Sequence, residues 1–184
     1  MAETVLTTDR LELRAIDEGH LDAHLEHLNT PAVMARLGGP RSREAIAEKH
    51  AASRASFAKE GFGFMLVYER DTGELVAHCG LKRVSNPLAP NVGTHEIGWL
   101  VREDRWRMGY AEEAVRALIN WAFDTHGAPH LVALTSESNI GSWKLMEKLG
   151  MERRTDLDFD DPFFSDEDNP TIQYGLTRER WENE

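Results

Sequence analysis

The chain has 184 residues, which is enough for one well-buried core and too few for two ordinary domains. The net charge of −11 argues against a nucleic-acid binder, since affinity for a phosphate backbone needs clustered Lys and Arg, and no run of about 18 apolar residues is present to span a membrane. The sole cysteine, Cys79, excludes an internal disulfide, and the first residues lack the basic start and apolar run of a signal peptide, so we expect a cytoplasmic protein with no membrane or nucleic-acid partner.

The first half of the chain alternates between short apolar-periodic segments and turn residues. Alternating apolar residues indicate strands, and leucines at helical spacing indicate helices. Capping and turn residues such as Ser42 and Gly73 mark where these elements begin and end. The expected elements, in order, are a strand over 6–16, helices over 18–28, 30–39 and 42–59, and a hairpin of strands over 62–69 and 75–84.

The second half predicts a strand–helix–strand–helix–strand order after a Pro-rich loop. Together the two halves indicate one α/β domain over residues 1–184 with a mixed sheet. The expected elements are a loop over 85–93, strands over 95–102, 131–136 and 171–177, helices over 112–126 and 139–149, and an acidic loop over 156–170.

The stretch from Trp99 to Ala111 reads as a strand, a charged turn and the start of an amphipathic helix. A loop that ends at a helix N-terminus offers backbone N–H groups and a positive dipole end to a phosphate, and Gly109 allows close approach or a positive φ. The same pattern also fits an ordinary strand–helix turn in which Gly109 only relieves strain. The stretch is neither a Walker loop nor a three-glycine Rossmann fingerprint.

The segments EIGWLVREDRWRMGYAEEAVRALINWAF and NIGSWKLMEKLGM resemble the core of the GNAT superfamily of N-acetyltransferases. The opening TTDRLELRAI and the tail DFDDPFF before IQYGL resemble its ribosomal-protein N-terminal acetyltransferase-like branch. The resemblance implies the GNAT-like acyl-CoA N-acyltransferase fold, with a mostly antiparallel sheet of about six to seven strands flanked by helices. It also implies acetyl-CoA as co-substrate, with no metal.

By this resemblance, the phosphate loop is the run from Trp106 to Ala111. Trp106 stands where Gln or Arg is usual, and Arg107 stands where glycine is common; we expect Arg107 to contact a phosphate, the alternative being that it crowds the loop. In the family the preceding strand is bulged and splays from its neighbour, and one of its backbone N–H groups can face the thioester oxygen as an oxyanion hole does. The cofactor-binding residues that the resemblance implies are Leu100, Val101, Arg102, Trp106, Arg107, Met108, Gly109, Tyr110, Ala111, Asn139 and Ser142.

Three residues are candidates for further roles at the site. The attacking amine must lose a proton, and Glu96 is our candidate for the general base; the alternative is a strand residue paired with a Lys or Arg across the sheet. The resemblance implies that Asn139 binds the pantetheine arm and that Ser142 protonates the leaving thiolate. Asn139 is also a common N-cap residue, and the two roles need not exclude each other.

His20, His24 and His27 share a helical strip at a spacing that metals use, but residues flanking the leucine stripe explain them without a metal. We expect direct acetyl transfer to a primary amine, either a protein N-terminus or a small amine. The helices over 18–59 and the loop over 156–170 would form the acceptor wall. A catalytically silent acyl-CoA-binding module and a nucleotide-binding α/β protein are the competing hypotheses, and homodimer formation is left open.

Overall fold

The protein is described here as a computed structural model over residues 2–183. One eight-stranded sheet in the order β1-β2-β3-β4-β5-β6-β8-β7 forms its centre. All neighbouring strands are antiparallel except β5 and β6. The strands are β1 (Thr4–Thr7), β2 (Leu11–Ala15), β3 (Phe64–Glu69), β4 (Leu75–Arg83), β5 (His95–Val101), β6 (His130–Ser136), β7 (Glu152–Arg153) and β8 (Thr171–Thr177).

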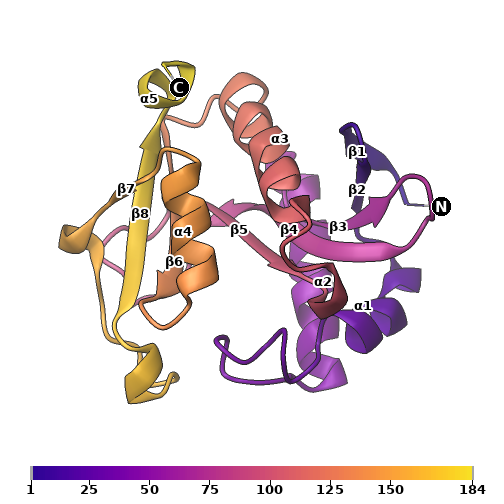
Figure 1. Cartoon of the computed structure of the whole chain (residues 1–184), viewed down its shortest axis with the longest axis horizontal. Coiled ribbons are helices and arrows are strands. Elements are labelled where there is room, and N and C mark those ends of the chain that lie inside the picture. Colours follow the sequence, from indigo (N-terminus) through magenta and orange to yellow (C-terminus); the bar gives the residue numbers. More distant parts are fainter. Residues whose placement is uncertain (1, 184) are drawn as a thin grey trace.

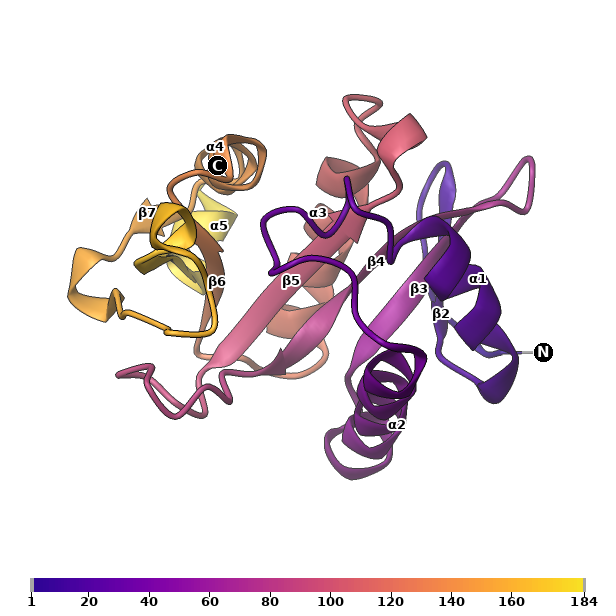
Figure 2. The same cartoon turned by 90° about the horizontal axis from the view of Figure 1, so that it is seen from below.

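Helices cover both faces of this sheet, with α2 on one side and α3 and α4 on the other (Figure 2). Helix α3 buries an apolar stripe that includes Val115, Leu118 and Ala122, as its 3.6-residue period predicts. No helix among residues 2–183 is both long and apolar enough to cross a membrane. The helices are α1 (Leu21–His27), α2 (Arg43–Glu60), α3 (Tyr110–Asp124), α4 (Ile140–Lys148) and α5 (Arg178–Glu182).

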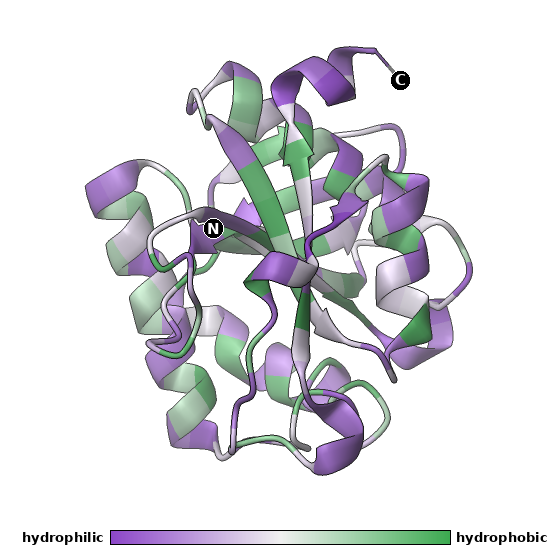
Figure 3. Cartoon of the chain, turned by 90° about the vertical axis from the view of Figure 1, so that its left-hand side faces the viewer, coloured by the Kyte–Doolittle hydropathy of each residue, from purple (hydrophilic) through white to green (hydrophobic). Residues whose placement is uncertain are grey.

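Apolar residues gather on the central strands, whereas the covering helices alternate between hydrophilic and hydrophobic positions (Figure 3). On the α3 side the main core joins residues of β2, β3, β4 and β5 to this helix. On the other side a smaller cluster holds Leu28 and Leu66, with Leu100 of β5 packed against it. Since side chains alternate along a strand, β5 contributes to both cores.

The N-terminal segment differs from the expectation at two places. The single strand expected over 6–16 is wrong: it is an antiparallel hairpin of β1 and β2. A tight turn separates the two strands, in which the Thr8 N–H donates to the Leu11 carbonyl and the Leu11 N–H to the Thr8 hydroxyl. The short helix expected over 30–39 is a series of hydrogen-bonded turns. Beyond these, the short elements β7 and α5 were not expected from the sequence.

The other expected elements are confirmed, most with ends shifted by a few residues. The β3–β4 hairpin turns at Arg70–Glu74, and α2 begins after Ser42, whose hydroxyl accepts a hydrogen bond from the Ala45 N–H at 3.1 Å. The strand expected over 171–177 is β8. The sheet is mixed and mostly antiparallel as predicted, with eight strands.

The parallel pair of β5 and β6 divides the sheet into two halves, β1–β5 and β6–β8, which lie on the right and left of Figure 1. These two strands pair at one position only, Glu96 with Val132. Beyond that position they diverge, and α3 and α4 each begin after one of them. The expected splay is therefore confirmed. The expected bulge is absent from the described ladder of β4 and β5, which runs from Arg83–His95 to Ala77–Val101 without a register shift.

Candidate active site

The splay opens into a cavity with a volume of about 780 Å³. Its walls come from the end of β5, the start of α3, the end of β6 and the start of α4, and from the connection between α1 and α2. Nine of the predicted cofactor-binding residues line it, whereas Arg102 and Met108 do not. The nine are Leu100, Val101, Trp106, Arg107, Gly109, Tyr110, Ala111, Asn139 and Ser142.

Two helix N-termini face this cavity, and neither is capped by a side chain. Gly109 precedes α3 and Asn139 precedes α4, and no side chain at either position bonds to the first turn. By contrast, Ser42 caps α2 and Thr177 caps α5, and α1 continues from a 3-10 turn over Glu18–His20 that Asp17 caps. The first N–H groups of a helix have no intrahelical acceptor, so α3 and α4 direct free donors and positive dipole ends at one space.

The loop before α3 holds two residues in the left-handed region. Gly109 has φ 81° and Arg107 has φ 62°. Glycine adopts such a conformation without strain, but for Arg107 it costs about 1–2 kcal/mol. This explains why the resemblance places a glycine at the Arg107 position, and it means that other contacts must hold the loop.

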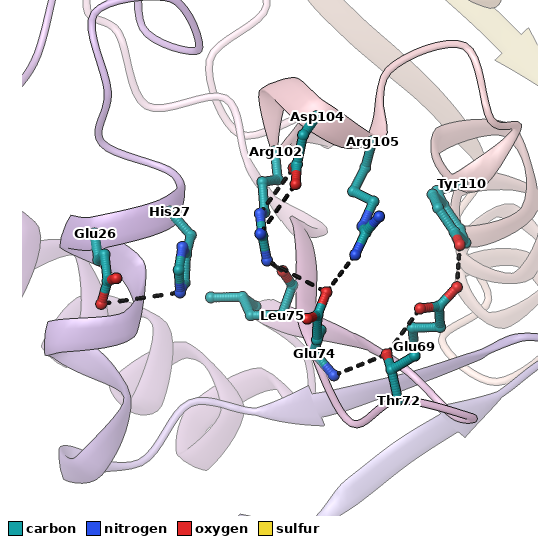
Figure 4. Close-up of polar contacts among 10 residues, drawn as sticks. All are labelled: Glu26, His27, Glu69, Thr72, Glu74, Leu75, Arg102, Asp104, Arg105 and Tyr110. Atoms are coloured by element: carbon teal, nitrogen blue, oxygen red, sulfur yellow. Dashed lines mark hydrogen bonds and ion pairs between the residues drawn. The ribbon is translucent and has the colours of Figure 1, made fainter.

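The turn between β3 and β4 supplies several of those contacts (Figure 4). The Glu74 carboxylate pairs with Arg105 and lies 3.7 Å from Arg102, and the Glu69 carboxylate accepts a hydrogen bond from the Tyr110 hydroxyl. This hydrogen bond is the largest contribution that lowers the pKa of Glu69. The start of the loop and the start of α3 are thus fixed to one rigid hairpin.

Two cations of the cavity wall have no carboxylate partner among the described residues. Arg105 pairs with Glu74 and Lys148 with Glu112, whereas Arg107 and Lys144 form no ion pair within residues 2–183. Arg107 belongs to the loop and Lys144 to α4, on the opposite wall. Sequence reasoning missed Lys144, because its position on a cavity wall depends on how α4 packs.

Asn139 and Ser142 stand at the start of α4, as predicted. The Asn139 backbone carbonyl accepts from the Ser142 N–H at 3.1 Å, but the Asn139 side chain makes no capping hydrogen bond. The capping role that its residue type favours is therefore not used, and Asn139 is one of the residues that line the cavity. Ser142 lines the same wall one turn further along.

The backbone of β5 directs the groups of Trp99 and Val101 toward the splay, where the Val101 carbonyl accepts a hydrogen bond of 2.8 Å from Nε1 of Trp106. The Arg102 N–H donates to the Val76 carbonyl at 2.9 Å, so Arg102 and Leu100 direct their backbone groups to β4. Backbone groups alternate between the two neighbours of a strand, and those of Trp99 and Val101 therefore face the splay. Of the three predicted positions, Leu100 and Val101 line the cavity; Trp99 was not predicted.

Glu96 lies at the closed end of the splay, where β5 and β6 still pair. It is buried, and its carboxylate is 3.3 Å from the Lys82 ammonium across the antiparallel ladder. Burial raises the pKa of Glu96, and Lys82 offsets part of that rise. The cross-strand pairing considered in the sequence is thus present, but the residue is buried rather than exposed. Ile97 and Gly98, not Glu96 itself, line the cavity.

Arg36, from the connection between α1 and α2, lies at one mouth of the cavity. Its guanidinium pairs with Glu167 at 2.6 Å and lies 3.5 Å from Asp168. Asp168 is buried and accepts hydrogen bonds from Ser136 and Ser138 at the end of β6. The acidic loop over 156–170 therefore packs against the α1–α2 connection at this mouth, as an acceptor wall would.

The three histidines of the helical strip, His20, His24 and His27, have different surroundings in the structure. His24 is buried and bonded to His50 of α2, with Nδ1 and Nε2 2.9 Å apart, and its ring lies 4.9 Å from that of His78 of β4. His20 accepts from the Asp17 N–H, and His27 is part-exposed near Glu26. The interpretation of His24 as a flanking residue is wrong. Among residues 2–183 no group of three metal-ligating side chains is arranged to hold an ion.

Residues 10–152 match the family model described as an acetyltransferase (GNAT) domain. The chain is 30% identical over 152 residues to the uncharacterized N-acetyltransferase YjdG of Bacillus subtilis, with 79% of this chain and 88% of that protein covered. Among solved structures, it is similar to an acetyltransferase from Agrobacterium tumefaciens at 28% identity and a TM-score of 0.76, covering 97% of this chain and 96% of that one.

The fold is also similar to that of RimL, a ribosomal L7/L12 alpha-N-protein acetyltransferase, in complex with coenzyme A. The TM-score is 0.76 at 16% identity, with 95% of this chain and 98% of that chain covered. At that identity the likeness supports the predicted branch at the level of the fold. The match over residues 10–152 and the relative at 30% identity go further: this chain belongs to the GNAT family of acetyltransferases, and the predicted enzyme class, N-acetyltransferase, is confirmed.

Proposed function

We propose that this protein transfers the acetyl group of acetyl-CoA to a primary amine, directly and within a ternary complex. The observation that carries the proposal is the convergence of two uncapped helix N-termini on one cavity at the splay of β5 and β6. Backbone N–H groups at helix starts neutralise a diphosphate without a metal. The unpaired cations Arg107 and Lys144 on the same walls support this assignment.

The residues present fit acetyl-CoA, which when bound supplies an acetyl group activated as a thioester. The first turn of α3 and Arg107 would bind the diphosphate. The backbone groups of Trp99 and the Val101 N–H, with the Asn139 side chain, would bind the pantetheine arm and polarise the acyl carbonyl. The start of α3, Arg107 and Asn139 all line the cavity, and neither helix start carries a side-chain cap.

Proton transfer would fall to Glu96 and Ser142. Glu96 is our proposed general base, acting through a water molecule because its side chain lies behind the wall that Ile97 and Gly98 form. Burial raises its pKa, which makes the carboxylate a stronger base than an exposed glutamate. Ser142, one helical turn from Asn139, would protonate the departing thiolate.

Direct transfer is favoured over a covalent acetyl-enzyme because of the position of Cys79. This residue, the chain's one cysteine, is fully buried in the core of β4, and burial raises the pKa of its thiol. A thiol of this kind is not a nucleophile. No cysteine lies on the described cavity wall, so none is placed to take the acetyl group before the amine does.

The acceptor is a primary amine, either a protein N-terminus or a small amine. It would enter at the mouth between the α1–α2 connection and the loop over 156–170, where Ala32 and Val33 line the cavity. RimL, which has a similar fold, is described as a ribosomal L7/L12 alpha-N-protein acetyltransferase. We also propose that the protein is cytoplasmic, that it has no nucleic-acid or membrane partner and that residues 1–184 form one domain.

A thermal-shift and turnover experiment tests this function. Coenzyme A at a hundred times its dissociation constant should stabilise the protein by about 2.7 kcal/mol and raise Tm by roughly 5–10 °C, whereas ATP or NAD should not. Release of free CoA from acetyl-CoA across a panel of amines should follow. A rise in Tm with CoA but no turnover would support the silent acyl-CoA-binding module instead. A rise in Tm with nucleotide and not with CoA would contradict the proposal.

Arg107 offers a sharper test of the diphosphate site. Arg107→Gly removes the charge and also relieves the positive φ, so the fold should gain stability while the Kd for CoA rises about five- to tenfold. The affinity should also become less sensitive to salt. Calorimetric titration at two salt concentrations measures both effects. Unchanged or tighter binding would show that Arg107 only crowds the loop.

A further inference from the structure

One carbonyl of the loop before α3 is held by a residue from the far end of the chain. The Met108 carbonyl accepts a hydrogen bond of 2.9 Å from Nη1 of Arg10, which is 98 positions away in sequence. Met108 lies between the two left-handed residues, Arg107 and Gly109. This is the peptide whose orientation decides where the backbone N–H groups of the loop point.

Arg10 is itself held in one orientation by the first turn of α3. Its Nε donates to the Glu113 carboxylate at 2.6 Å, and its backbone N–H donates to the same carboxylate at 2.8 Å. The guanidinium also lies over the Tyr110 ring, 4.5 Å from its centroid. The planar guanidinium therefore spans the junction between loop and helix, bonding the loop through one nitrogen and the helix through another.

The Glu113 carboxylate is the centre of this contact. Besides the two bonds from Arg10, it accepts the Thr8 hydroxyl at 2.6 Å. Burial raises the pKa of Glu113, but the hydrogen bonds from Thr8 and Arg10 outweigh it and leave the pKa below its usual value. Its charge pairs with that of Arg10, which leaves Arg107 as the cation of the loop that has no partner within the described residues.

We propose that Arg10 is a positioning residue of the coenzyme A site. Through the Met108 carbonyl it holds the loop in the conformation that aims backbone N–H groups at the diphosphate, and Glu113 holds Arg10. The turn at residues 8–10, remote in sequence from the family's phosphate loop, is thereby a working part of that site. This inference rests on the proposed function, since it assumes that the loop binds the diphosphate.

Arg10→Ala tests the proposal, with Arg70→Ala as its matched control. Nη1 of Arg70 donates to the carbonyls of Thr8 and Asp9 at 3.1 Å, so it supports the same turn without touching the loop. Arg10→Ala should raise the Kd for CoA about tenfold and leave the Kd for pantetheine, which has no diphosphate, unchanged. Arg70→Ala should change neither, and Arg10→Lys should not rescue, since an ammonium cannot make both bonds.

Amide hydrogen exchange of the free protein gives a readout that needs no ligand. Exchange of the Glu113 amide, which donates to the Gly109 carbonyl at 3.1 Å, should accelerate about tenfold in Arg10→Ala and not in Arg70→Ala, with exchange in the β3–β4 ladder unchanged in both. Equal effects of the two variants on CoA affinity, or equal loss of CoA and pantetheine binding, would overturn the inference. If the unaltered protein fails to bind CoA, the proposed function fails, and the exchange experiment still decides whether Arg10 holds the loop.

Discussion

Glu96→Gln should lower kcat by a factor of about 100 to 1000 while the KM for acetyl-CoA stays the same. The amide keeps the volume of the buried side chain and can still contact Lys82, so the closed end of the splay should keep its shape. What it loses is the capacity to accept a proton from the amine. Steady-state kinetics with the acceptor identified in the amine panel measures both constants.

The pH profile separates a base from a structural residue. Because burial raises the pKa of Glu96, kcat/KM should fall as the pH drops through a value above the ordinary glutamate range, and this acid limb should vanish in Glu96→Gln. Lys82→Met should shift the limb to higher pH, since the ammonium that lowers this pKa is gone. Glu60→Gln is the control: Glu60 pairs with Arg83, the neighbour of Lys82 on β4, and it does not line the cavity. An acid limb that persists in Glu96→Gln would remove Glu96 from this role.

The buried histidines His24, His50 and His78 should make the protein lose about 6 kcal/mol of unfolding free energy between pH 7.5 and pH 5, roughly 2 kcal/mol from each ring. Burial lowers the pKa values of His24 and His50 to about 4, and it lowers that of His78 further. The charged groups that act on the three rings are cations, Lys49 and Arg54 among them. No described carboxylate stabilises a protonated ring.

The sign follows from linkage. The unfolded chain takes up protons near pH 6.5 and the folded protein only near pH 4, so stability is complete above pH 6.5 and declines as the pH falls toward 4. Urea unfolding at a series of pH values measures the slope.

A double variant identifies the source of that slope. His24→Asn with His50→Gln keeps a hydrogen bond between the two side chains but removes both titrating rings, and the slope between pH 7.5 and 5 should fall by more than half. His27→Gln, at a part-exposed ring outside the cluster, should leave it unchanged. A double variant with the full slope would place the acid sensitivity elsewhere.

The elements that the sequence predicted well are those whose apolar pattern repeats many times or whose turn residues are unambiguous. The helix α3 repeats its apolar stripe over four turns, and the β3–β4 hairpin has Asp71 and Gly73 between two apolar runs. The two wrong elements are short. The turn at Thr8 and Arg10 interrupts what reads as one alternating strand, and it is stabilised by Glu113, about 100 residues further along the chain.

The candidate site was predictable in its parts. Gly109, Asn139 and Ser142 were singled out by residue type and by a family resemblance, and all three lie on one cavity. The sequence could not show that the Asn139 side chain leaves α4 uncapped, because asparagine is an ordinary capping residue. Nor could it show that Arg10 serves the loop, because nothing local connects the two.

The sequence by itself determined the order of the longer strands and helices, the amphipathic face of α3 and the residue types available at the start of α3 and α4. These depend on local periods and backbone preferences, which act within a few residues. Only the tertiary structure decided that the two helix starts face one cavity, that Lys82 lies opposite Glu96, and that three histidines from separate elements are buried together. Those facts follow from strand register and the packing of distant segments, where a shift of one residue would turn each side chain to the other face.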